Sequence, residues 1–150
     1  MRLERFQLIS HVDRVDRTAR SIVCRCDIPL QSGIFDGHFP GHPLFPGTLM
    51  IEAVAQAAGL LVLALHDFRR MPVLIGVEKA RMRAMVKPGA VLAAESRLVQ
   101  EGAGYVAAAG HLASEGRKVA EAEVRLGTIP FPSEALRAEA RKFAAEVALV

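Results

Sequence analysis

Residues 49–65 read LMIEAVAQAAGLLVLAL, a stretch in which only Glu52 and Gln56 are strongly polar. Its length is marginal for crossing a bilayer, and a carboxylate near one end makes a membrane span less favourable still. A segment that is apolar nearly all round is typical of a helix enclosed by other elements rather than one lying on a surface. We therefore expect a buried core helix and no membrane span.

The segments on either side of this helix alternate apolar and polar residues, which is typical of strands that cover a hydrophobic partner on one face. Near the end of the chain, for example, Ala120 and Val124 share the apolar face of a strand whose other face has Glu121 and Glu123. The elements that we expect are a hairpin at about 5–29, a loop at 31–47, the helix from Gly47 or Thr48 to about 66–68, strands near 72–87, 90–101, 104–114 and 117–129, and an amphipathic helix capped by Ser133.

This order predicts one α+β domain over residues 1–150, with an antiparallel sheet of about six strands wrapped around one central hydrophobic helix. Residues 132–150 form an additional C-terminal helix. The chain is 51% hydrophobic, which is enough apolar material for such a core. Its net charge is only +3, and its basic residues are not interleaved with aromatic ones, so nucleic-acid binding is not indicated.

The cysteines and the N-terminal residues indicate in which cellular compartment the protein is expected. Cys24 and Cys26 are the only cysteines, and alternate positions on a strand would point both side chains to one face. A disulfide between them would be strained and a zinc site would need further ligands, so we interpret them as small buried residues in a reducing compartment. The N-terminal residues include no apolar segment typical of a signal peptide, and we expect a cytoplasmic protein.

The polar side chains of the core helix lie along a single stripe, since Thr48, Glu52 and Gln56 recur at every fourth position. Burial of a carboxylate is costly unless it is paired or neutralised, so Glu52 should have a hydrogen-bond partner or stay protonated at neutral pH. A protonated carboxyl is what a general acid requires. The alternative is a Glu that an Arg holds at a subunit interface.

The loop at 31–47 is rich in Gly and Pro, which deny it a continuous helix or strand, yet its apolar residues should pack against the body of the domain. It contains His38 and His42, four residues apart. Without a helix, and without a third ligand at a supporting spacing, this pair does not indicate a metal site. A His fixed in a loop that leads into a helix with a buried acid is instead a candidate general base, and His38 and Glu52 are the pair that we single out.

The start of the core helix is a third element of the candidate site. Unpaired backbone N–H groups near Gly47 and Thr48 lie at the positive end of the helix dipole, and Gly47 lets a ligand approach the backbone closely. We expect the Thr48 hydroxyl to cap the helix rather than act as a nucleophile. A base, an acid and an oxyanion site beside an apolar channel suit proton abstraction next to a carbonyl, with loss or movement of a neighbouring group.

The loop and helix contain the motifs GHFPGHP at 37–43, FPG at 45–47, IEA at 51–53 and AQA at 55–57. Together these motifs resemble the signature of the FabZ-type 3-hydroxyacyl-[acyl-carrier-protein] dehydratases, and a looser similarity extends over about residues 5–129. A Glu rather than an Asp at position 52 is similar to the FabZ type more than to the FabA type. The helix from Ser133 lies beyond the family pattern, and we interpret it as a sign of a specialised pathway for unusual or very long acyl chains.

The resemblance implies a hot-dog fold and a homodimer with active sites at the subunit interface, with assembly into a trimer of dimers left open. It implies that His38 and Glu52 are the catalytic residues and come from opposite subunits. It also implies that the N–H of Gly47 or Thr48 binds the thioester carbonyl and that Gln56 holds Glu52. The expected reaction, in fatty acid biosynthesis, removes water from a (3R)-3-hydroxyacyl thioester to give the trans-2-enoyl thioester, with no cofactor and no metal.

The partner that the resemblance implies is an acidic acyl carrier protein. Arg81, Arg83 and Lys87, which we expect on one strand face, are candidates for its docking patch, together with Arg69 and Arg70 after the helix; a solvated strand face is the equal alternative. Two other functions stay open. One is an acyl thioesterase on the same fold, in which the helix carboxylate activates water, and the other is a non-catalytic acyl-binding subunit.

Overall fold

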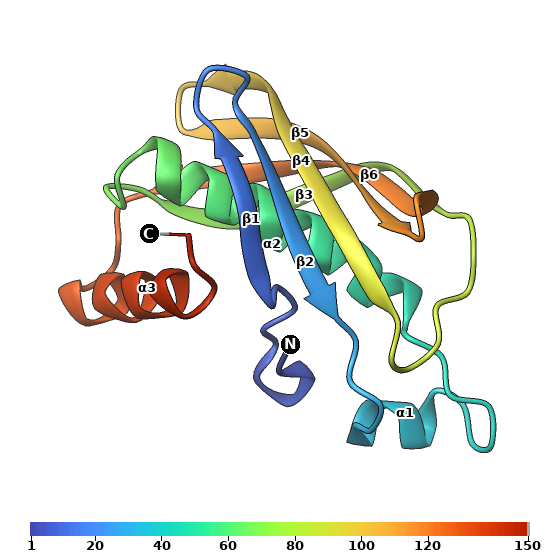
Figure 1. The fold of residues 1–150 in the computed structure, drawn as a ribbon. Helices are drawn as coiled ribbons and strands as arrows, with labels where there is room; N and C mark the ends of the chain where they lie inside the picture. Colours follow the sequence, from blue (N-terminus) through green and yellow to red (C-terminus); the bar gives the residue numbers. More distant parts are fainter. Residues whose placement is uncertain (150) are drawn as a thin grey trace.

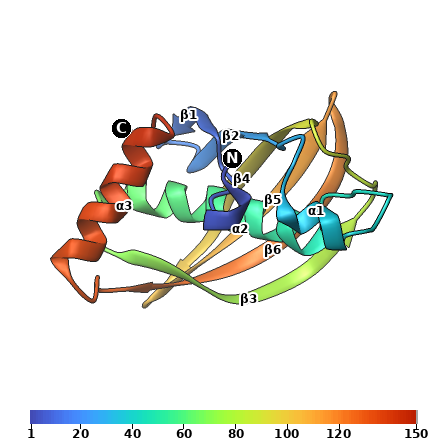
Figure 2. The same cartoon turned by 90° about the horizontal axis from the view of Figure 1, so that it is seen from below.

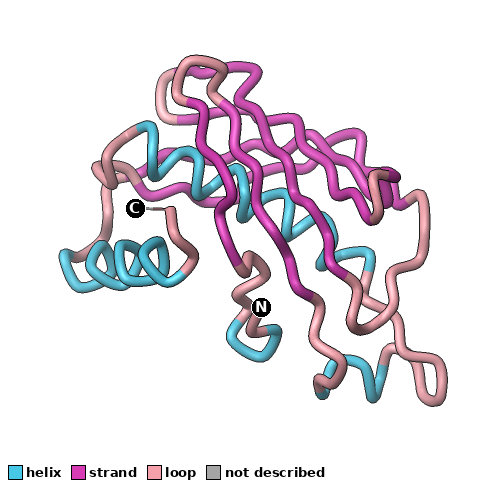
Figure 3. Tube along the Cα trace, in the orientation of Figure 1, coloured by secondary structure: helices cyan, strands magenta, loops and turns pink. Residues whose placement is uncertain are grey.

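The computed structural model describes residues 1–149, which form one antiparallel sheet and the helices around it (Figures 1 and 3). The sheet has six strands in the order β1-β2-β4-β5-β6-β3. Along the chain the elements are a 3-10 turn, η1 (Leu3–Arg5), then β1 (His11–Asp16), β2 (Ser21–Asp27), α1 (Gly33–Gly37), α2 (Gly47–Leu65), β3 (Met71–Met82), β4 (Val91–Gly102), β5 (Tyr105–Ser114), β6 (Arg117–Ile129) and α3 (Glu134–Glu146). The predicted α+β class, with six strands, a central helix and a C-terminal helix, is confirmed.

Helix α2 lies in the concave face of the sheet, which curves around it (Figures 1 and 2). Its residues Val54, Ala57 and Leu61 are fully buried there, at 0% exposure. Burial of a side chain such as Val or Leu contributes about 1.5–3 kcal/mol to stability. By length and composition α2 could cross a membrane, but 67% of its apolar window is buried inside the described part of the protein, so it is the predicted core helix.

The sheet approaches α2 closely at Gly110 of β5. A Cβ atom at this position would lie 2.7 Å from Val54 Cγ1 and 2.6 Å from Ser96 Oγ. The Ser96 hydroxyl is buried on β4 and donates a hydrogen bond to the Val54 carbonyl oxygen at 3.1 Å. This bond anchors the middle of α2 to the sheet, and the missing side chain at Gly110 leaves room for it.

Strand β3 is shorter than the strand predicted at 72–87, since it ends at Met82. There the N–H groups of Arg83 and Ala84 both donate hydrogen bonds to the Val119 carbonyl oxygen, at 2.7 and 3.3 Å, and the regular pairing of β3 with β6 stops. The predicted end is wrong because the sequence from 82 to 85, MRAM, contains no Gly, Pro or Asn to signal a strand terminus.

The loop at 31–47 contains one helical turn, α1, where the sequence predicts no continuous helix. Ser32 caps this turn, because its hydroxyl oxygen accepts a hydrogen bond from the N–H of Ile34 at 3.3 Å. Phe35 is buried and fixes the turn to the body of the domain. His38 follows α1 directly, so the candidate base lies next to a small anchored element.

Helix α3 lies outside the sheet and crosses the end of α2 that is remote from α1 (Figure 2). Ser133 caps it as predicted, accepting a hydrogen bond from the N–H of Leu136 at 3.1 Å. Ala144 is buried, and the carbonyl oxygen of the buried Val147 accepts a hydrogen bond from Val12 of β1 at 2.7 Å. The C-terminal helix is therefore fixed to the domain at the edge of its sheet.

Cys24 and Cys26 are free and fully buried in β2, in agreement with their interpretation as small core residues. Burial raises the pKa of both thiols, that of Cys26 to about 12. Both are protonated thiols at neutral pH, and neither is poised for thiolate chemistry.

The close approach at Gly110 predicts a loss of stability in the variant Gly110→Ala. The new methyl group would collide with Val54 and Ser96, so the free energy of unfolding should fall by about 1–3 kcal/mol in urea titrations. Gly33→Ala is the matched control, because a Cβ there meets nothing within 4 Å, and its stability should equal or slightly exceed that of the wild type. Equal stability of Gly110→Ala and wild type would contradict the tight packing of β5 on α2.

Candidate active site

His38 lies in a tight loop between α1 and α2, and backbone hydrogen bonds hold that loop closed. The N–H of Leu44 donates to the His38 carbonyl oxygen at 2.8 Å, while Phe39 and His42 exchange two backbone hydrogen bonds of 3.1 and 2.9 Å. The His38 ring stacks on the ring of Phe39, with ring centroids 4.1 Å apart. These contacts fix both the backbone and the ring of the candidate base.

The Nδ1 atom of His38 lies 3.1 Å from the carbonyl oxygen of Leu44. Because a carbonyl oxygen only accepts hydrogen bonds, the neutral ring that makes this bond has its proton on Nδ1. Its Nε2 then presents a lone pair. This is the arrangement that a general base needs, since one ring nitrogen is oriented by the protein and the other is left to take a proton.

Glu52 lies in the second turn of α2 and is half-buried. Its Oε1 accepts a hydrogen bond from Nε2 of Gln56 at 2.9 Å, so the predicted hydrogen-bond partner is present. The same Gln56 amide donates to the Phe6 carbonyl oxygen at 2.8 Å and accepts from the N–H of Leu8 at 2.9 Å. Gln56 thus ties the candidate acid to the N-terminal segment of the chain.

The third part of the candidate site is the first turn of α2, where backbone N–H groups lack partners within the helix. Leu49 and Met50 donate the first hydrogen bonds of the helix to the Pro46 carbonyl oxygen, at 3.0 and 3.1 Å. The N–H groups of Gly47 and Thr48 therefore precede the helical ladder and lie at its positive end. The predicted Thr48 cap is wrong: the helix begins at Gly47, one of the two expected starts, with Pro46 as its N-cap and no capping side chain.

An apolar groove of about 210 Å³ runs along α2, and among the described residues Glu52 is the only charged one that lines it. Its walls come from α2, β3, β6 and α3, with the lining residues Glu52, Ala55, Gln56, Gly59, Leu60, Leu63, Pro72, Leu74, Leu126 and Phe143. His38 is not among them. In a single copy of the chain, Glu52 therefore faces this groove without the candidate base.

The predicted docking residues do not share one strand face. Arg81 is in β3, whereas Arg83 and Lys87 follow the end of that strand. Arg69 and Arg70 lie after the opposite end of α2, and a helix of 19 residues is about 28 Å long. Within one copy of the chain, the structure brings Arg81, Arg83 and Lys87 to the side of the sheet near the start of α2 and leaves Arg69 and Arg70 apart.

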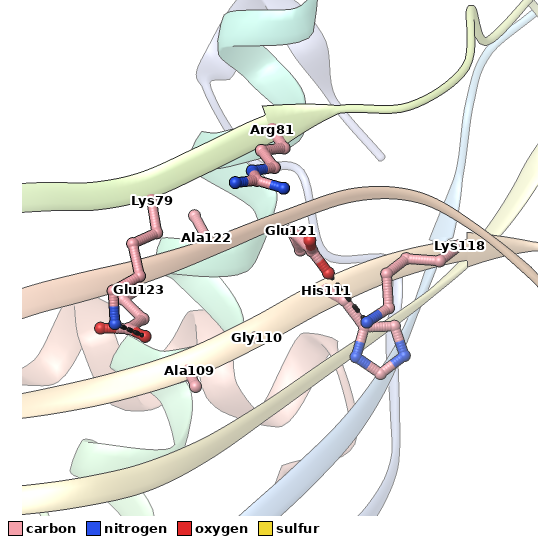
Figure 4. Close-up of a pocket in the computed structure, with 9 residues that line it drawn as sticks. All are labelled: Lys79, Arg81, Ala109, Gly110, His111, Lys118, Glu121, Ala122 and Glu123. Carbon is pink, nitrogen blue, oxygen red and sulfur yellow. Dashed lines mark hydrogen bonds and ion pairs between the residues drawn. The ribbon is translucent and has the colours of Figure 1, made fainter.

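A charged cleft of about 330 Å³ lies over β3, β5 and β6 and includes Arg81 (Figure 4). Two ion pairs line it: Lys79 of β3 with Glu123 of β6 at 2.7 Å, and Lys118 with Glu121, both of β6, at 2.8 Å. Glu121 also pairs with Arg83. Hydrogen bonds from Lys118 and then Arg83 lower the pKa of Glu121 to about 2, so much of the positive charge here is matched within the sheet surface.

Two contacts of the site have no signal in the sequence. The N-terminal segment supports Gln56 across a separation of 48 residues, through Leu8. Phe143 of α3 reaches the groove from the far end of the chain. Neither spacing nor composition predicts such contacts, because they arise only when the sheet brings distant segments to the same helix.

A six-stranded antiparallel sheet that wraps one long helix defines the hot-dog class of proteins. Among solved structures, the chain is similar to the dehydratase heterocomplex ApeI:P from Xenorhabdus doucetiae, with a TM-score of 0.68 and 18% identity over 89% of each chain. It is also similar to a putative thioesterase from Lactococcus lactis, with a TM-score of 0.69 and 13% identity over 87% of this chain and 99% of the other. These likenesses establish the fold.

The family follows from the sequence matches. The FabA-like domain matches residues 2–123, and the chain belongs to this family. It is 35% identical to the 3-hydroxyacyl-[acyl-carrier-protein] dehydratase FabZ of Thermotoga neapolitana over 113 residues, covering 75% of this chain and 81% of that protein. It is likewise 35% identical to FabZ of Clostridium acetobutylicum over 118 residues, covering 78% and 83%. The predicted resemblance to the FabZ-type dehydratases is confirmed.

The ion pairs of Glu121 predict a pH-dependent contribution to stability. Because the folded state lowers the pKa of Glu121 from 4.5 to about 2, its stabilising effect is present above pH 4.5 and is lost as the pH falls toward 2. The variant Glu121→Gln should therefore unfold more easily than the wild type at pH 7, and the difference should shrink between pH 4.5 and 2 in thermal melts. Glu115→Gln, in an exposed turn, is the control. A difference that grows at low pH would contradict this assignment.

Proposed function

We propose that this chain removes water from a (3R)-3-hydroxyacyl thioester on an acyl carrier protein and forms the trans-2-enoyl thioester. The observation that carries the proposal is the hydrogen bond between His38 Nδ1 and the Leu44 carbonyl oxygen, which leaves Nε2 as a base. It is joined by the Glu52 carboxyl, oriented by Gln56 at the polar part of an apolar groove. The FabZ names of the relatives support the same reaction.

In the proposed mechanism, His38 Nε2 removes a proton from C2 of the substrate, next to the thioester carbonyl. The electron pair of that C–H bond forms the C2–C3 double bond as the C3–O bond breaks. The departing hydroxyl takes a proton from Glu52 and leaves as water. Gln56 donates to Oε1 of Glu52, so Oε2 is the oxygen that would hold this proton. Proton return from His38 to Glu52 restores the starting state, and no electron carrier is needed.

The N–H groups at the start of α2 complete the proposed site. As the C2 proton leaves, partial negative charge develops on the thioester oxygen in the transition state, and donors already aimed at that position lower the barrier. The N–H groups of Gly47 and Thr48 suit this role, because they precede the first hydrogen bonds of the helix and lie at its positive end. The side of Gly47 where a Cβ would stand is filled by Met82 of β3, whose Cγ would lie 3.0 Å from that Cβ, so this glycine makes room for the strand.

The active protein in this proposal is a homodimer in which His38 and Glu52 of one site come from opposite copies. Strand β3 supports pairing of two copies, since it is a long edge strand with the exposed apolar side chains Leu74, Ile75 and Val77. An unpaired edge of this kind is a template for another strand. Because Pro72 and Leu74 of β3 also line the groove, a partner strand there would lie beside Glu52.

The carrier protein is proposed to dock through Arg81, Arg83 and Lys87, which offer positive charge to an acidic partner even though Glu121 pairs with Arg83. Lys87 is well placed for this, because the neighbouring Val86 accepts a hydrogen bond from the N–H of Phe45 at 2.8 Å. Phe45 belongs to the segment between His38 and α2, so Lys87 lies beside the loop of the candidate base. We infer a cytoplasmic location from the same fatty-acid role.

The first test measures formation of the enoyl product from a 3-hydroxyacyl thioester, with free thiol followed in the same reaction. His38→Ala and Glu52→Gln should each lower kcat by about a hundred-fold to ten-thousand-fold, since each removes one proton-transfer group. His42→Ala, in the same loop, is the control and should keep most of the activity. Release of thiol without enoyl product would overturn the dehydratase in favour of a thioesterase, and neither product with any substrate would favour an acyl-binding subunit.

The shared site makes a second prediction, that two inactive variants restore activity together. After mixed refolding of His38→Ala with Glu52→Gln, half of the dimers contain both variants and one of their two sites has an intact pair, so activity should return to about a quarter of the wild-type value. Each variant refolded alone stays inactive. Activity that stays absent in the mixture, with mixed dimers shown by native mass spectrometry, would place both residues in the same copy.

A further inference from the structure

We propose that Phe143 of α3 closes the far end of the groove beside Glu52 and limits the length of the acyl chain that the protein accepts. The inference rests on the proposed function, because it takes the groove as the place of the acyl chain. Helix α3 lies beyond residues 2–123, the part that the FabA-like domain matches. Its role is therefore not a property of the shared domain.

The groove has a polar beginning and an apolar continuation, as an acyl thioester requires. Glu52, Gln56, Gly59 and Leu63 follow one another along one face of α2, at intervals of three or four residues. At 1.5 Å per residue, Glu52 and Leu63 are about 16 Å apart along the helix axis. Beyond Gln56 every lining side chain is apolar, so an alkyl chain that passes the candidate acid continues toward the end of α2 over which α3 lies.

Phe143 is the residue of α3 that lines the groove, and it also lies beside Gln7 and Ile9 of the N-terminal segment at a neighbouring cavity. Helix α3 crosses the end of α2 remote from α1 (Figure 2), and the Arg141 guanidinium lies 4.8 Å from the centre of the Phe68 ring, just after α2. Two residues further along α3, Phe143 is half-buried and lines the groove together with Leu63 and Leu126. An aromatic ring at this position forms a wall that an extending alkyl chain meets.

The contacts of α3 with the rest of the domain fix the position of Phe143. Ala144 and Val147, one and four residues after Phe143, are buried, and Val147 accepts a hydrogen bond from the backbone of β1. Glu146 forms an ion pair with Arg2 at 3.0 Å. A ring on so anchored a helix limits chain length, and the test below decides between this limit and the unusual or very long acyl chains expected from the sequence.

The test compares Phe143→Ala and Phe143→Trp with the wild type on 3-hydroxyacyl thioesters of six, ten and sixteen carbons. Phe143→Ala should raise kcat/KM for the longest chain relative to the shortest by about ten-fold or more, because one added or removed group in an apolar pocket changes selectivity by such factors. Phe143→Trp should shift the preference toward the shortest chain. Leu136→Ala is the matched control, since Leu136 is exposed on the same helix and does not line the groove.

A binding measurement separates failure of this inference from failure of the proposed function. Saturated acyl-pantetheine thioesters of the same three lengths are titrated against each variant by calorimetry, which needs no turnover. If the wild type is inactive but Phe143→Ala gains affinity for the longest chain, the dehydratase fails and the length limit holds. If the length profiles of Phe143→Ala and Phe143→Trp match that of the wild type while circular dichroism shows both folded, the role of Phe143 is overturned. A shift in Leu136→Ala equal to that in Phe143→Ala would likewise overturn it.

Discussion

The enclosure of α2 is the constraint on which the rest of this structure depends. A helix with so few polar side chains is stable in water only if other elements cover almost all of it, and a single curved sheet does so with six strands. Polar groups inside that enclosure must find partners, and Ser96 and Gln56 show how, each bonding to a backbone group of a distant segment. The same enclosure directs Glu52 to the one face of α2 that the sheet leaves open as a groove.

Much of the fold could be predicted from the sequence because its signals are local and strong. The period of two in β6 and the almost continuous apolarity of α2 each depend on a single physical rule, burial of apolar side chains, and both elements match their predicted ranges closely. The start of α3 was likewise predictable, because the Ser133 hydroxyl caps the helix by accepting a hydrogen bond from the N–H of Leu136. The end of β3 and the turn of α1 escaped prediction, since backbone bonds to Val119 and a cap at Ser32 fix them rather than any side-chain pattern.

The candidate site, too, could be predicted from the sequence only in part. His38 and Glu52 stand out in the sequence, one in a loop fixed by Gly and Pro and the other as a lone carboxylate in an apolar helix. Their surroundings do not. The Leu44 carbonyl that selects the His38 tautomer and the Phe6 and Leu8 backbone that holds Gln56 take part as peptide groups, which every residue has. Arg81, Arg83 and Lys87 lie close together in the sequence, but the sequence does not indicate that Glu121 neutralises part of the charge of Arg83.

The attachment of α3 has a consequence for how this protein can change over evolutionary time. The helix meets the groove through Phe143, while almost all of the core, Ala144 and Val147 apart, and the residues proposed for proton transfer belong to other elements. Substitutions in α3 can thus alter what the groove holds without passing through variants that lose the core or the chemistry. Divergence among paralogues would be expected to concentrate in this appended segment, with the ancestral domain retained almost unchanged beneath it.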